Sequence, residues 1–191
     1  MLAVLMVALT IAQTPTAALD VDLRKIGHIE SKGRVQDTAH NQRDVVGRLL
    51  TAGPAAIPFL VSKLEDETTI PGGIIDFWPE VRIGDVAFVI LCDLFLESDE
   101  TTVTVPGLSW ASLLEEPANR EVPAWELLHA FAAKHGRVAI RRKVESVLKT
   151  YGSDLRWDSK ERCFRPAKLA DAAAEHRAAP DRRADIVGAG G

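Results

Sequence analysis

Cysteine is scarce in this chain, as are the short motifs of metal and cofactor chemistry. Its 191 residues include two cysteines, Cys92 and Cys163, and neither has a second cysteine or a histidine at the spacing of metal ligands. A glycine-rich phosphate loop, a Gly-x-Ser-x-Gly elbow and a Cys-x-x-Cys pair are also missing. The sequence therefore predicts no metal site and no cofactor, and it favours a role other than catalysis. One Cys92–Cys163 disulfide and two buried thiols both remain open.

An excess of positive charge is missing as well. The formal net charge is −4 and the isoelectric point is about 5.7, which argues against a nucleic-acid partner. The charge is distributed unevenly, however: residues 65–100 hold ten acids and the single base Arg82, whereas residues 134–149 hold six bases and the single acid Glu145. An acidic middle and a basic later helix can neutralise one another within one fold.

Long hydrophobic runs are confined to the N-terminus. Residues 2–12 are apolar over a length typical of a signal peptide, and shorter than the roughly 20 residues that a membrane-spanning helix needs. Small residues follow at positions 16–18, so we predict a signal peptide over 1–18, a periplasmic or secreted protein, and no membrane span in the mature chain. No Lys or Arg precedes the apolar run. A buried first helix of an intracellular protein is therefore the alternative.

The remaining chain shows mainly helical periodicity. Apolar residues recur at helical spacing in four segments, and a fifth segment is apolar on nearly every side. Helices are expected over residues 38–52, 54–66, 79–95, 123–135 and 137–151. Residues 155–157 and 163–165 flank a polar turn and predict a small β-hairpin. We therefore expect an all-α fold, a short irregular stack of antiparallel helices over 19–152, with a hairpin or extended segment at 153–166 and a weakly helical to disordered tail at 167–191.

Residues 53–95 resemble one HEAT-type helical repeat. Two sets of residues carry this resemblance, one for each helix of the unit: Gly53, Ala56, Ile57, Pro58, Leu60, Leu64 and Asp66, and then Val81, Arg82, Ala87 and Leu91. The chain departs from the pattern by a long insert at residues 67–80. The resemblance implies that Asp66 and Arg82 have a structural role between the two helices.

The apolar segment 81–95 carries two acids, Asp85 and Asp93. They are eight residues apart, so they lie about 80° apart around a helix and share one side. Arg82 precedes Asp85 by three residues and can pair with it. A buried carboxylate without a partner costs several kcal/mol, so we expect the basic helix 137–149 to supply Arg141 or Arg142 to Asp93. The alternative is a small extracytoplasmic hydrolase that uses Asp76, Asp85 or Asp93.

The insert is the best candidate for a contact with another molecule. It places two aromatic residues, Phe77 and Trp78, beside Asp76 and Glu80 in a glycine-containing loop. Aromatic side chains on loops are common anchors at protein interfaces, although Trp78 can instead pack back over the helical hairpin. We therefore expect an exported interaction or scaffold module whose partner is another protein. Trp125 and His129, four residues apart, are expected to be packing neighbours.

Overall fold

The computed structural model describes residues 19–28, 34–35, 45–72, 80–99, 101–114, 124–151 and 155–167. Three features predicted from the sequence lie outside these ranges: the signal peptide at 1–18, the insert residues Asp76, Phe77 and Trp78, and almost all of the C-terminal tail.

Helices make up most of the described chain. They are α2 (Val45–Ala52), α3 (Ala56–Lys63), α4 (Ile83–Asp93), α5 (Trp110–Leu113), α6 (Ala124–His135) and α7 (Arg137–Tyr151), with short 3-10 turns at η1 (Leu23–Lys25) and η3 (Gly53–Ala55). Four strands are also present: β1 (Thr69–Ile70), β2 (Val81–Arg82), β3 (Leu155–Asp158) and β4 (Cys163–Pro166). They form two separate antiparallel pairs, β1 with β2 and β3 with β4.

The prediction of an all-α fold is therefore wrong, and the error concerns the insert. Its beginning pairs with the residues that directly follow it, with Ile70 opposite Val81. Both of these side chains are buried, so the pairing covers apolar surface and satisfies main-chain groups where the chain returns from α3 to α4. Strands of two residues are too short to show the alternation by which a sequence reveals a strand.

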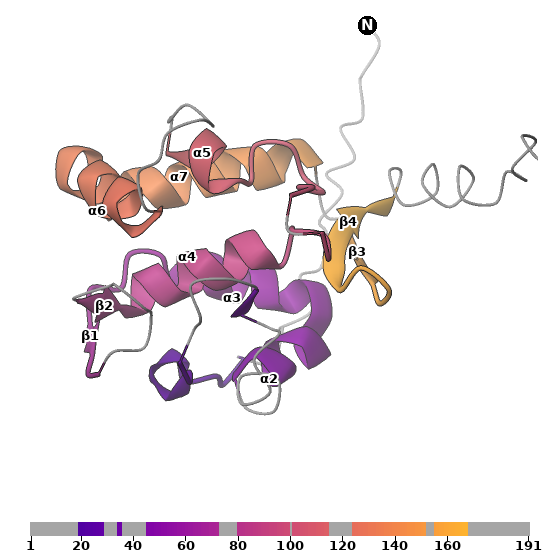
Figure 1. Ribbon diagram of the computed structural model, residues 1–191, viewed down its shortest axis with the longest axis horizontal. Coiled ribbons are helices and arrows are strands. Elements are labelled where there is room, and N and C mark those ends of the chain that lie inside the picture. Colours follow the sequence, from indigo (N-terminus) through magenta and orange to yellow (C-terminus); the bar gives the residue numbers. More distant parts are fainter. Residues whose placement is uncertain are drawn as a thin grey trace, which may run out of the picture.

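Helix α4 lies at the centre of the molecule. Every residue from Ile83 to Cys92 is buried, which explains why this segment is apolar on nearly every side. In Figure 1, α5, α6 and α7 lie on one side of α4, and α2 and α3 lie on the other. The β1–β2 pair adjoins the beginning of α4, and the β3–β4 hairpin lies near its end.

Helices α2 and α3 are separated at Gly53. This glycine has a φ of 61°, in the left-handed region that typically ends a helix.

By length and composition, Val45–Lys63 is the one candidate for a membrane-crossing helix within the described part of the chain. About 39% of its most apolar stretch is buried inside the protein, including Val46, Leu49 and Leu60.

The β3–β4 hairpin is attached to the end of α4. The amide of Phe164 donates to the carbonyl of Leu94 at 2.7 Å, and the buried Arg34 donates to the carbonyls of Leu96 and Glu161 at 3.2 and 2.9 Å. Phe164 also packs edge-to-face on Trp157, with ring centroids 5.1 Å apart. The hairpin expected at 155–165 is thus present and forms part of the core.

The two cysteines are free and both are buried, so the disulfide alternative is not formed. Burial raises the pKa of Cys92 well above its ordinary value and raises the pKa of Cys163 to about 11. Neither thiol has the low pKa and the exposure of a reactive cysteine. Both act as small apolar side chains of the core.

Candidate functional site

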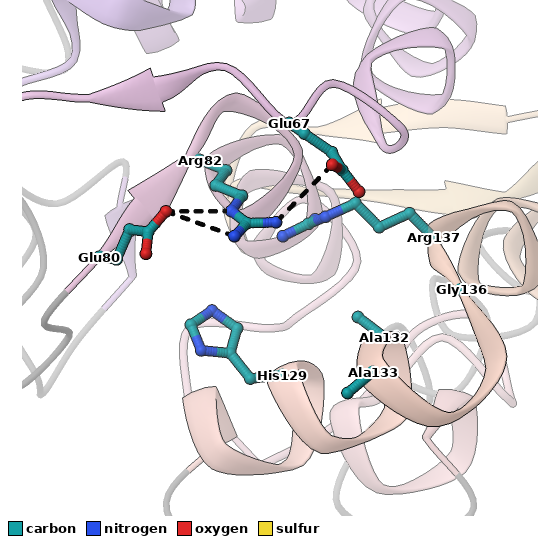
Figure 2. Close-up of a pocket in the computed structure, with 8 residues that line it drawn as sticks. All are labelled: Glu67, Glu80, Arg82, His129, Ala132, Ala133, Gly136 and Arg137. Carbon is teal, nitrogen blue, oxygen red and sulfur yellow. Dashed lines mark hydrogen bonds and ion pairs between the residues drawn. The ribbon is translucent and has the colours of Figure 1, made fainter.

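A pocket of about 410 Å³ opens between the β1–β2 pair and helices α6 and α7. Figure 2 shows its wall, where Arg82 of β2 and the two ends of the insert, Glu67 and Glu80, lie across from α6. The pocket is lined by Glu67, Glu80, Arg82, His129, Ala132, Ala133, Gly136 and Arg137. The pocket thus combines acidic and basic side chains with the small residues Ala132, Ala133 and Gly136.

Behind this wall lies Asp85, whose side chain is completely buried. One of its oxygens, Oδ1, accepts from Nη2 of Arg137 at 2.6 Å, and the other, Oδ2, accepts from the backbone amide of Arg82 at 2.9 Å. Asp85 is the third residue of α4, where a carboxylate caps a helix and favours its dipole. Asp85 therefore caps α4 and joins it to the first residue of α7.

Gly84 allows the end of α3 and the guanidinium of Arg137 to lie close to the first turn of α4. A β-carbon at this position would lie 2.6 Å from the carbonyl oxygen of Leu64 and 2.8 Å from Nη1 of Arg137. The amide of Gly84 also donates to the carbonyl of Asp66 at 2.9 Å. The end of α3, the beginning of α4 and the guanidinium of Arg137 thus meet around a residue without a side chain.

Arg82, to which the HEAT resemblance gives a structural role between the two helices, contacts the two ends of the insert. Its guanidinium lies 3.3 Å from Glu80 and 3.9 Å from Glu67, and its contact with Asp85 is made by the backbone amide instead. Asp66 accepts from the amide of Thr68 at 3.0 Å. Although partial burial opposes ionisation, hydrogen bonds from Thr68 lower the pKa of Asp66. Asp66 and Arg82 therefore have separate partners: Arg82 belongs to β2 and contacts Glu67 and Glu80, the two ends of the insert.

Asp93 and Arg141 have contacts other than the predicted one. Asp93 accepts from the backbone amide of Val35 at 2.6 Å. Arg141 pairs with Glu145 at 2.8 Å and with Glu65 at 3.2 Å. Within the described residues no bond joins Asp93 to Arg141 or Arg142, so this part of the prediction is corrected. Asp93 lies at the end of α4 where the N-terminal segment crosses it.

His129 enters the pocket from α6. Its Nε2 lies 3.6 Å from Oδ2 of Asp85, and about a third of its side chain is exposed. Its ring packs edge-to-face on Trp125, with centroids 5.9 Å apart, which confirms these two residues as packing neighbours. No local sequence pattern assigns His129 to a site, because nothing in it shows that α6 meets the beginning of α4.

The acids around the pocket differ in exposure: Glu67 and Glu80 line it together with His129, whereas Asp85 does not. Asp85 has no exposed surface, and Glu67 and Glu80 both turn toward Arg82 (Figure 2). A general acid or base must reach a substrate, which Asp85 cannot do. Over the described residues there is also no group of three or more His, Cys, Asp or Glu side chains that could hold a metal ion. Of the four predicted partner-binding residues, Glu80 is the one within the described ranges, and it lines the pocket.

Comparisons of the chain with protein-family models, with curated proteins and with solved structures give no match. The pocket and its connection to the insert are therefore the basis for a functional assignment.

Proposed function

We propose that this chain is an exported, mainly helical binding module that holds a protein partner at the pocket and at the adjoining insert. One observation carries the proposal: Glu80, the last residue of the insert, lines the pocket. The β1–β2 pair fixes both ends of the insert at this wall. A partner that contacts Phe77 and Trp78 can therefore also reach the charged pocket.

The composition of the pocket supports this assignment. Protein interfaces combine aromatic anchors with a polar rim, and the insert sequence supplies the aromatics while the pocket supplies the charges. The α3–α4 pair, as a HEAT-like unit, would act as the rigid scaffold on which the loop is presented. Of the acids named for the hydrolase alternative, Asp85 is buried and Asp93 lies at the other end of α4.

A photo-crosslinking residue at position 80 tests the binding site. In the native host, we expect position 80 to give a discrete adduct with one protein, and the Phe77→Ala/Trp78→Ala change to reduce its yield several-fold, as loss of two aromatic anchors predicts. Position 138 on α7 is the matched control, because Val138 is exposed and lies outside the pocket lining. Equal adducts from both positions, or a yield unchanged by the double substitution, would contradict the proposal.

Export is tested separately by mass spectrometry of the mature chain from its host. Cleavage after the small residues at 16–18 is expected to leave a chain that begins near Leu19. Recovery of a chain that still begins at Met1 would argue against a cleaved signal peptide.

A further inference from the structure

Arg82 is held in the pocket by weak contacts. Its Nε and Nη2 both point to the same oxygen of Glu80, at 3.4 and 3.3 Å, and its Nη1 lies 3.9 Å from Glu67. Charge-assisted hydrogen bonds between these groups are normally about 2.7–2.9 Å long, and the strong arrangement uses two carboxylate oxygens. The side chains of Glu80 and Glu67 are 53% and 68% exposed. Exposed pairs of this kind are exchanged easily.

Arg137 brings further donors to the same pocket. Its side chain is only 6% exposed and lines the pocket. A guanidinium has five N–H groups, yet among the described residues its one hydrogen bond is that from Nη2 to Asp85. Its other N–H groups are not among the buried atoms that lack a hydrogen-bond partner, so they reach solvent, and the pocket is the open space beside them.

From these two arginines we infer that the pocket binds a carboxylate of the partner, and that Glu80 occupies the place of that carboxylate when no partner is bound. This inference rests on the proposed function. An additional anion beside Glu67, Glu80 and Asp85 would be repelled, but an anion that displaces Glu80 exchanges one charge for another. Glu80 can turn into solvent because it is already half exposed. The incoming carboxylate then receives the donors of Arg82 and the unused donors of Arg137.

Two sources of a carboxylate are compatible with this chemistry, an acidic side chain and a free carboxyl terminus. Two peptides separate them: N-acetyl-Gly-Glu-Gly-amide and N-acetyl-Gly-Ala-Gly with a free terminus. N-acetyl-Gly-Gln-Gly-amide is the uncharged control. Binding is followed by NMR through the indole N–H of Trp125, which packs on His129 in the pocket wall and is assigned by a Trp125→Phe variant. We expect a saturable shift with at least one carboxylate peptide and none with the glutamine peptide.

Charge-removing variants then test the exchange itself. Glu80→Gln removes the internal competitor and is expected to tighten carboxylate binding roughly two- to fivefold, the range that loss of one exposed ion pair allows. Arg82→Gln leaves only the donors of Arg137 and is expected to weaken carboxylate binding about tenfold or more, the loss of a charge-assisted hydrogen bond. Glu65→Gln is the matched control: Glu65 also pairs with an arginine, at 3.2 Å from Arg141, but lies outside the pocket lining, so its removal leaves affinity unchanged.

The inference is overturned if neither carboxylate peptide binds better than the glutamine peptide, or if Glu80→Gln binds no tighter than Glu65→Gln. Failure of this inference can be told apart from failure of the proposed function. If the position-80 adduct depends on Phe77 and Trp78 but is unaffected by Arg82→Gln, the chain binds a protein partner there without recognising a carboxylate.

Discussion

Substitution of Arg137 by methionine is expected to lower the free energy of unfolding by about 3–5 kcal/mol, the range measured when one partner of a buried ion pair is removed. Arg137 supplies the ionic partner of Asp85 at 2.6 Å, and the two side chains are 6% and 0% exposed. Methionine has a side chain of similar length but no hydrogen-bond donor, so the Asp85 carboxylate stays buried and loses its counter-charge. Urea unfolding followed by circular dichroism measures the change.

Two variants control this result. Asp85→Asn/Arg137→Met removes both charges, and an asparagine oxygen can still accept from the amide of Arg82, so the double variant is expected to recover a large part of the lost stability. Arg141→Met lies on the same helix but breaks only exposed pairs, which are worth about 0–1 kcal/mol. If Arg137→Met were no more destabilising than Arg141→Met, the buried pair would not be the main connection between α4 and α7.

The sequence predicted that an acid and an arginine of these two helices would pair, but it did not identify the two residues. Helical periodicity and burial indicated that an acid of segment 81–95 needs an arginine from segment 137–149. Periodicity places side chains around a helix axis, but it does not fix how far one helix is displaced along another. The structure places the first residue of α7 beside the first turn of α4, so Arg137 contacts Asp85. Arg141, one turn later, lies beside Glu65 of the α3 end instead.

The residues that line the pocket were harder to predict from the sequence than the residues of the core. Its lining comes from the two ends of the insert and from α6 and α7, and no local motif connects these segments. Glu80 was selected from the sequence because it belongs to the insert, whereas His129 and Arg137 become neighbours of Glu80 only when the helices pack. The strands that position Glu80 and Arg82 were missed for a related reason. Two-residue strands are stabilised by tertiary contacts and leave almost no pattern in the sequence.

Substitution of Gly84 by alanine is expected to destabilise the protein by about 1–3 kcal/mol, the usual cost of forcing extra atoms into a packed site. Helix propensity alone predicts the opposite, since alanine is favoured over glycine in helices by about 1 kcal/mol. The added methyl group would lie 2.6 Å from the carbonyl of Leu64 and 3.1 Å from that of Asp66. Both are backbone atoms, so the end of α3 must move away from α4. The loss is measured by urea unfolding.

Gly53→Ala separates this steric effect from backbone strain. Gly53 has a φ of 61°, and a β-carbon added to it would have no atom within 4 Å, so alanine there costs only the left-handed conformation, about 1–2 kcal/mol. Gly84→Ala should in addition weaken carboxylate binding, because its methyl group would lie 2.8 Å from Nη1 of Arg137 and displace that guanidinium from the pocket. Gly53→Ala should leave binding unchanged. A Gly84→Ala protein with full stability and full affinity would show that the α3–α4 contact yields without disturbing Arg137, and that the pocket does not depend on the close approach of these helices.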